Sequence, residues 1–195
     1  MEVVRKLVYN TDDYWCGDKG YRPPGYRDFT INTVKEICIM IEKPRSLLDI
    51  GCAYGYTVGR MLDLDIPAKG IDISSLAISR APQWLQGSLV EGVLWDMPFK
   101  DKEFDYGYSS GVLEHIPQDK LEKTISEIKR VCNRGLIGVA IDKPTEEEGE
   151  DDTHCTWLSL EEWRKLFEPN FKVISDSESS WRITASLSVY KGIWG

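Results

Sequence analysis

One stretch decides the fold of this chain, and it reads Leu47-Leu48-Asp49-Ile50-Gly51-Cys52-Ala53-Tyr54-Gly55. It starts as a short apolar run that stops at glycine, as a buried parallel strand does. Gly51 suits a tight turn, and Gly55 would let a ligand approach the backbone closely. Residues 55–63 then place apolar side chains on one side and predict a helix. A strand, a glycine turn and a helix in this order indicate a ligand-binding α/β domain.

Strands and helices alternate along most of the chain. Further strands are predicted at residues 68–73, 88–95, 104–109 and 135–142. Helices are predicted at residues 31–41, 74–81, 121–132 and around 160–167. Two final strands, near 171–175 and 181–190, have no helix between them, and the last alternates apolar and polar side chains like a half-exposed antiparallel strand. We therefore expect an α/β three-layer Rossmann-like sandwich with a mostly parallel seven-stranded sheet and an antiparallel C-terminal edge hairpin.

Length and composition fit one globular domain. The chain has 195 residues, of which 42% are hydrophobic and 29% are charged, as is normal for a protein with a buried core. We expect a single domain over residues 1–195, with an aromatic lid segment at 1–28 and a Rossmann-like core at 29–195. No stretch approaches the roughly 18 apolar residues of a membrane span, and the first residues lack the pattern of a signal peptide. These features predict a cytoplasmic protein with no membrane partner.

Charge and cysteine usage disfavour other classes. The formal net charge of −8 makes nucleic acid a poor default partner, because proteins that bind phosphate backbones usually carry a basic face. The five cysteines are odd in number and never spaced as C-x-x-C. This usage argues against a disulfide framework or a zinc knuckle and indicates reduced thiols inside a cell.

An acidic residue at the end of the second strand strengthens the prediction of a ligand site. Asp72 follows Gly51 at the spacing of about 20 residues at which a carboxylate can accept hydrogen bonds from ribose hydroxyls. The alternative is that Asp72 only caps the helix that begins at Ser74 and Ser75, which are themselves good N-cap residues.

Four stretches, in order, resemble the motifs of the class I S-adenosylmethionine-dependent methyltransferases over about residues 29–190. The first two are Asp49-x-Gly51-x-x-x-Gly55 and Gly70-Ile71-Asp72-Ile73-Ser74. The third is Asp96-Met97-Pro98-Phe99 followed by Phe104-Asp105, and the fourth is Ser109-Ser110-Gly111-Val112-Leu113-Glu114-His115-Ile116. The resemblance implies S-adenosyl-L-methionine as the methyl donor and S-adenosyl-L-homocysteine as the product.

The resemblance also implies where the donor would bind. Asp49 would order the glycine loop or lie near the methionine amino group, and Asp72 would hold the ribose. Ser110 and Gly111 would lie beside the sulfonium. Arg22 or Arg27 could meet the carboxylate, unless these arginines are ordinary surface charges. The implied donor-binding residues are Asp49, Gly51, Cys52, Ala53, Gly55, Asp72, Ile73, Val93, Leu94, Trp95, Ser110, Gly111 and Arg27.

Two positions depart from the family pattern. Ala53 stands where the family commonly has another glycine, which such loops tolerate. Val93 stands where many members have an aspartate that binds the adenine amino group. Adenine would then rely on the packing of Val93, on the backbone of Leu94 and on the neighbouring Asp96.

The two histidines are the candidate catalytic residues. A sulfonium methyl group is already activated, so the protein mainly has to align the acceptor with the S–CH3 bond. A hydroxyl acceptor would also need a base, and His115 and then His154 are the candidates. The alternative for His115 is that it bonds the backbone where a helix begins.

The same histidines raise the question of a metal ion. Some relatives hold a divalent ion with Glu-x-x-Glu-His and a distant histidine. Here Gly111 occupies the first glutamate position, which leaves Glu114, His115 and His154. Three ligands of mixed type make a weak case, so the sequence predicts no metal.

The acceptor is expected to be a small molecule or a sugar, since no separate domain is available to recognise a protein or a duplex. Its pocket would form from the lid segment and from the loop at 143–157. The expected aromatic walls are Tyr14, Trp15, Tyr21, Tyr26, His154 and Trp157. The acidic run at 146–152 is either a solvated loop or part of this pocket, where it would favour a cationic or polyol acceptor. The oligomeric state is left open. Two other functions compete: a catalytically silent adenosyl-binding protein, and an NAD-dependent oxidoreductase. The oxidoreductase is disfavoured because residues 51–55 do not read G-x-G-x-x-G.

Overall fold

The computed structural model describes residues 9–12, 15, 34, 44–139, 153–167, 172–176 and 190–194. These residues belong to two compact units, Met1–Pro98 and Phe99–Gly195. The helix predicted at 31–41 lies outside the described residues except for Val34, which is helical and buried. Whether the two units form one domain, as the sequence predicts, stays a prediction.

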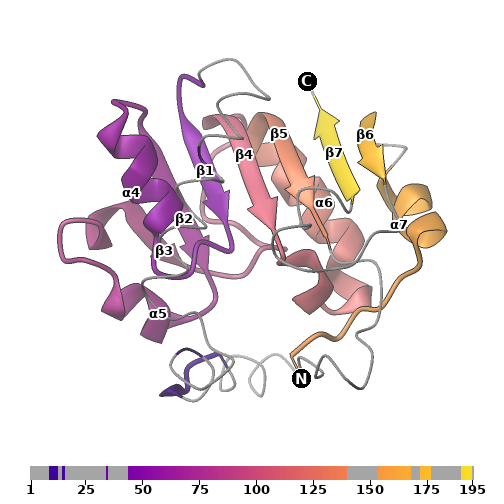
Figure 1. Cartoon of the computed structure of the whole chain (residues 1–195), viewed down its shortest axis with the longest axis horizontal. Coiled ribbons are helices and arrows are strands. Elements are labelled where there is room, and N and C mark those ends of the chain that lie inside the picture. Colours follow the sequence, from indigo (N-terminus) through magenta and orange to yellow (C-terminus); the bar gives the residue numbers. More distant parts are fainter. Residues whose placement is uncertain are drawn as a thin grey trace. The chain divides into compact units, whose positions relative to one another are not determined.

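The first unit contains three parallel strands joined through helices (Figure 1). Its elements are β1 (Leu47–Ile50), α4 (Tyr56–Asp63), β2 (Ala68–Asp72), α5 (Ser75–Arg80), η1 (Gln86–Ser88) and β3 (Leu89–Glu91). Strand β2 pairs with β1 on one side and with β3 on the other, so that Asp49 faces Gly70 and Asp72 faces Glu91. The parallel arrangement brings the carboxyl ends of these strands to one edge of the sheet.

The core of the first unit follows from its apolar runs. All four residues of β1 are buried, as expected of a parallel strand covered on both faces. Helix α4 buries Val58 and Met61, in agreement with the predicted amphipathic pattern. Ser74 is the N-cap of α5, and its hydroxyl oxygen accepts the amide of Ala77. The predicted helices at 55–63 and 74–81 are confirmed.

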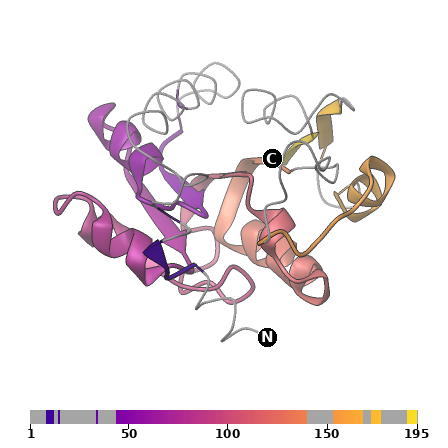
Figure 2. The same cartoon turned by 60° about the horizontal axis from the view of Figure 1, so that its bottom comes forward.

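Among its described residues, the second unit contains one parallel and two antiparallel strand pairings. Its elements are β4 (Phe104–Ser110), η2 (Leu113–His115), η3 (Gln118–Lys120), α6 (Leu121–Val131), β5 (Cys132–Gly138), α7 (Leu160–Phe167), β6 (Lys172–Asp176) and β7 (Tyr190–Trp194). Strands β4 and β5 are parallel, while β7 runs antiparallel to both β5 and β6. Figure 2 shows α6 beside β5, against which it packs. The α/β class and the parallel pairings agree with the Rossmann-like prediction.

Three predicted boundaries differ from the structure. The strand predicted at 88–95 ends at Glu91, because Glu91 pairs with the last residue of β2 and the chain turns away after Gly92. The helix predicted to end at Cys132 stops one residue earlier, and Cys132 is buried because it begins β5. Strand β5 accordingly begins at Cys132, before the predicted start at Gly135. The strand predicted at 181–190 lies outside the described residues except for Tyr190, which belongs to β7. The edge hairpin and the seven-stranded sheet stay predictions.

Within the part of the chain that the structure describes, no helix combines the length and the apolar character needed to span a membrane.

The tight contact between β2 and the glycine loop yields a stability prediction. A Cβ atom at Gly70 would lie 2.6 Å from both Cβ and Sγ of Cys52. We expect Gly70→Ala to lower the free energy of unfolding by about 1–3 kcal/mol, because it overpacks a dense core. The measurement is urea denaturation, with Gly87→Ala as the matched control, since a Cβ there meets nothing within 4 Å. Equal effects of the two substitutions would contradict the packing argument.

Candidate functional site

The loop between β1 and α4 has the backbone geometry predicted for a ligand-binding turn. Gly51 and Gly55 have positive φ angles of 80° and 73°, a region that favours glycine. The amides of Gly51 and Cys52 both donate to the carbonyl oxygen of Ile71, at 2.8 and 3.1 Å. Ala53 also has a positive φ, of 48°. The loop is therefore tightly curved and is bonded to the end of β2.

Asp72 fixes this loop through its carboxylate. One oxygen accepts the backbone amide of Ala53 at 2.8 Å, and the other accepts that of Ser74 at 2.8 Å. Asp72 thus binds the amide of Ser74, which is itself the N-cap of α5. A carboxylate has about four acceptor positions, so these two bonds leave acceptor capacity for hydroxyl groups.

A second buried carboxylate, Asp49, lies in β1 beneath the loop. It is only 5% exposed. Burial raises the pKa of Asp49 to about 7, and the charge of Asp72 adds to this effect, while a hydrogen bond from Thr57 opposes it. Burial also raises the pKa of Asp72, against the effect of its backbone amide donors. The same burial raises the pKa of Cys52, which keeps its thiol neutral.

Residues of the N-terminal segment pack against the start of α5. Trp15 donates from its indole Nε1 to the carbonyl oxygen of Tyr9 at 2.6 Å and to Oγ of Ser74 at 3.1 Å. Its ring meets Tyr54 edge-on, with centroids 5.2 Å apart. Asn10 Oδ1 accepts the amide of Leu76 at 2.9 Å. Trp15, predicted as a wall of the acceptor pocket, is instead a buried member of a core cluster with the glycine loop.

The residues predicted to contact adenine follow β3. The amide of Gly92 donates to the carbonyl oxygen of Asp72 at 2.9 Å, which holds this segment at the end of β2. Val93 and Trp95 are partly exposed, Leu94 is buried and Asp96 is exposed. The packing of the partly exposed Val93 against adenine stays a prediction.

In the second unit, Ser110 and Gly111 end β4 and begin the following turn. Ser110 is partly exposed. Gly111 has a positive φ of 66°, and its amide donates to the carbonyl oxygen of Gly138 at 3.2 Å. This left-handed turn leads directly into η2, which carries Glu114 and His115.

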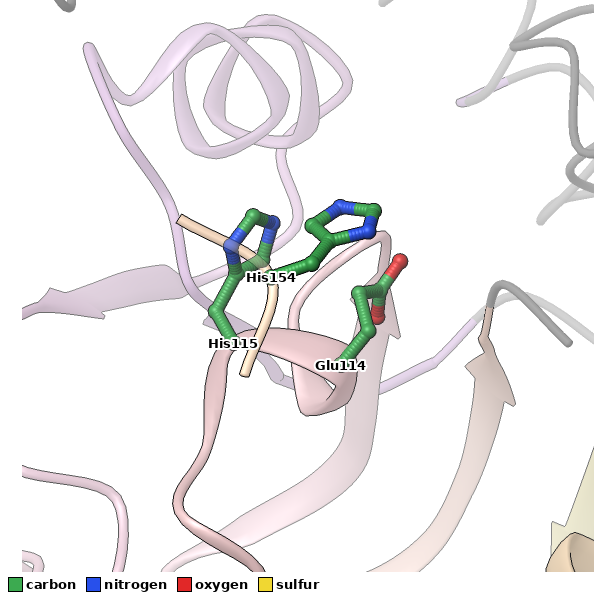
Figure 3. A group of neighbouring side chains, drawn as sticks. All are labelled: Glu114, His115 and His154. Carbon is green, nitrogen blue, oxygen red and sulfur yellow. The ribbon is translucent and has the colours of Figure 1, made fainter. Parts of the chain in front are cut away.

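Glu114, His115 and His154 come together in the second unit (Figure 3). Each offers a potential ligand atom, and these atoms all lie within 4.8 Å of one another. The two imidazole rings meet edge-on, with centroids 4.4 Å apart. Both predicted catalytic histidines are therefore neighbours, although they are far apart in the sequence.

Several predicted site residues lie outside the described residues. These are Tyr14, Tyr21, Arg22, Tyr26, Arg27 and the acidic residues at 146–152. Of the predicted loop at 143–157, the structure describes residues 153–157, where the ring of Trp157 lies 4.7 Å from that of His154.

Sequence reasoning missed two supporting side chains. Thr57 donates a hydrogen bond to Asp49, and Thr153 Oγ1 lies 3.0 Å from Nδ1 of His115. The position of Thr57 in the first turn of the predicted helix was an available signal, because that turn lies next to the strand end. No sequence signal indicated the contact of Thr153, because its neighbour His115 is distant in the sequence.

Comparison with known proteins identifies the kind of domain. Residues 48–139 match a family described as "Methyltransferase domain". Ajmaline N-methyltransferase from Rauvolfia serpentina is 39% identical over 102 residues, which are 48% of this chain and 34% of that protein. 24-Methylenesterol C-methyltransferase 2 from Arabidopsis thaliana is 31% identical over 129 residues, or 60% of this chain and 34% of that protein. The matched part thus spans about a third of the length of these relatives.

Solved structures show the same fold at low sequence identity. Magnesium protoporphyrin IX methyltransferase from Synechocystis PCC 6803, with bound S-adenosylhomocysteine, has a TM-score of 0.70 and 18% identity. The alignment covers 99% of this chain and 97% of that one. The PH0226 protein from Pyrococcus horikoshii OT3 has a TM-score of 0.69 and 17% identity, covering 97% and 98% of the two chains.

The raised pKa of Asp49 leads to a prediction about pH. Because the folded-state pKa of about 7 exceeds the ordinary aspartate value of 3.8, the folded protein holds this proton more tightly than the unfolded chain does. The stability that Asp49 contributes is therefore full below about pH 4 and is lost as the pH rises towards 7. Relative to wild type, Asp49→Asn should gain on the order of 1.4 kcal/mol of stability per pH unit across this range.

Urea denaturation at several pH values measures this effect. Asp65→Asn is the matched control, because Asp65 is exposed and the substitution changes the net charge equally. Asparagine also tolerates the positive φ of 58° at that position. A constant difference between Asp49→Asn and wild type from pH 4 to pH 7 would contradict the assignment.

Proposed function

We propose that the chain transfers the methyl group of S-adenosyl-L-methionine to a small-molecule or sugar acceptor, because residues 48–139 match a family described as "Methyltransferase domain". The names of two relatives support the small-molecule part, since one methylates an alkaloid nitrogen and the other a sterol carbon. Because these names differ in the acceptor atom, the proposal extends to the class of acceptor and not to the atom.

The observation that carries this proposal is the carboxylate of Asp72 at the carboxyl end of β2. It holds the glycine loop and the start of α5, and it retains acceptor capacity for a ribose hydroxyl. Ligands of open α/β sheets bind beyond the carboxyl ends of the strands. The backbone of Gly51, Cys52, Ala53 and Gly55 would then lie along the methionine part of the donor.

Asp49 supports the same proposal through charge. The methionine part of the donor carries an ammonium group, and a cation near a carboxylate favours its ionised form. Asp49 lies beneath the loop with a raised pKa, so a bound ammonium would offset part of the cost of its burial. Donor binding and the ionisation of Asp49 would thus reinforce each other.

The remaining donor contacts carry over from the family motifs. Ile73, Val93, Leu94 and Trp95 would surround the ribose and adenine. Ser110 and Gly111 would contribute backbone near the methionine, and Arg27 would meet its carboxylate. The positive φ of Gly111 supports a tight turn at that position.

The chemistry requires little of the protein beyond placement. A lone pair of the acceptor attacks the methyl carbon in line with the C–S bond. As the new bond forms, the C–S bond breaks and its electron pair stays on sulfur, which gives S-adenosyl-L-homocysteine. Holding the two reactants in this geometry contributes about 7–11 kcal/mol in well-oriented reactions.

Calorimetric titration with S-adenosylmethionine, S-adenosylhomocysteine and NAD tests the donor site. We expect micromolar affinity for the first two ligands and no binding of NAD. Asp72→Asn should weaken binding at least ~10-fold, because hydrogen bonds to a charged group are worth about 1.5–3 kcal/mol. Asparagine keeps one acceptor oxygen for the loop, so this variant preserves more of the local structure than alanine would. Asp65→Asn is again the matched control.

Thermal melting of the unliganded variants separates loss of the site from loss of the fold. Binding of NAD in place of S-adenosylmethionine would replace the proposal with an oxidoreductase. Tight donor binding without turnover on a broad panel of small molecules and sugars would support the silent adenosyl-binding protein.

A further inference from the structure

The Glu114–His115–His154 cluster is held in place by the backbone around it. The amides of Cys155 and Thr156 both donate to the carbonyl oxygen of Glu114, each at 3.0 Å. Thr156 Oγ1 also donates to the carbonyl oxygen of Ile116 at 2.6 Å. These three bonds fix the segment that carries His154 against η2, so the cluster is assembled by the protein itself.

The ring of His115 is oriented by a neighbour outside the cluster. Its Nδ1 lies 3.0 Å from Oγ1 of Thr153. When Nδ1 donates its hydrogen to this hydroxyl, Nε2 presents its lone pair. Metal-binding histidines are commonly oriented in this way, by a hydrogen bond from the ring nitrogen that does not bind the ion.

The carboxylate of Glu114 is almost completely buried, with 2% of the residue exposed. Figure 3 shows the carboxylate and both imidazole rings on the same side of η2, turned towards one another. One cation bound among them could take the carboxylate and both rings as ligands.

We propose that Glu114, His115 and His154 bind one divalent transition-metal ion, with zinc as the preferred ion. Two imidazoles and one carboxylate suit zinc, iron, cobalt or nickel, whereas magnesium and calcium favour sites built from oxygen ligands. Three protein ligands are also the usual number in zinc sites that keep one coordination position open. That open position would accept water or a polar atom of a bound molecule.

The spacing of the ligand atoms fits this ion after a small adjustment. Tetrahedral zinc with bonds of about 2.0–2.2 Å places its ligand atoms roughly 3.3–3.6 Å apart. The corresponding atoms here lie within 4.8 Å of one another. Binding the ion would therefore draw the three ligand atoms closer together.

A metal ion bound here would exclude the role of catalytic base that the sequence predicts for the two histidines. A nitrogen bound to a metal has no lone pair left to accept a proton, so His115 and His154 would act as ligands and not as bases. The sequence predicts no metal because Gly111 replaces a glutamate of the pattern seen in some relatives. A fourth ligand from position 111 is not required, because the ligand atoms of Glu114, His115 and His154 already lie close together.

Metal titration of the full chain tests the proposal. The protein is stripped with a chelator, dialysed, and titrated with Zn²⁺ by calorimetry and with Co²⁺ by visible absorption. We expect one equivalent to bind with a dissociation constant below about 10 μM. Glu114→Gln, His115→Ala and His154→Ala should each weaken binding at least tenfold. Thr153→Val should weaken it about tenfold through the loss of ring orientation, within the range for outer-shell partners of about 10–100-fold.

Glu122→Gln is the matched control, since it removes the same charge from an exposed position of α6, and it should leave metal affinity unchanged. Circular dichroism and S-adenosylmethionine titration of the stripped variants show whether they remain folded, and they test the donor site independently of the metal site. Failure of wild type to bind either ion below about 100 μM would overturn the proposal. Binding that survives all three cluster substitutions would do the same.

Discussion

The carboxylate of Asp72 is the interaction on which the first unit depends. Its two oxygens bond the amides of Ala53 and Ser74, and so join the glycine loop, the end of β2 and the start of α5. Three loop residues have positive φ angles, so the loop cannot satisfy its amides by continuing a helix or strand. The loop is held at the strand edge because the Asp72 carboxylate accepts the amide of Ala53 and the carbonyl oxygen of Ile71 accepts those of Gly51 and Cys52.

This arrangement has an electrostatic cost. Asp49 and Asp72 are both buried, and each raises the energy of the other's ionised form. A protein selected for stability alone would gain by replacing one of them with an uncharged residue. The pair would suit the proposed donor, which would bring hydroxyl groups to Asp72 and positive charge to Asp49.

The sequence predicts the first unit well because its signals are local. The apolar run before Gly51, the cap at Ser74 and the acidic Asp72 each act on residues nearby in the chain. The errors have non-local causes: Cys132 looks like the last apolar position of a helix, but its burial comes from pairing with β4. The Glu114–His115–His154 cluster likewise depends on hydrogen bonds from the amides of Cys155 and Thr156 to the carbonyl oxygen of Glu114, which is distant in the sequence. The periodicity of the sequence does not predict such bonds.

The contact between Gly70 and Cys52 also bears on the history of the chain. The space between β2 and the glycine loop holds one small side chain, and position 52 occupies it. A mutation that adds a methyl group at position 70 becomes acceptable only after position 52 has lost its own side chain. The order of such changes would then decide which intermediates survive, so these two positions are expected to evolve as a pair although nearly twenty residues separate them.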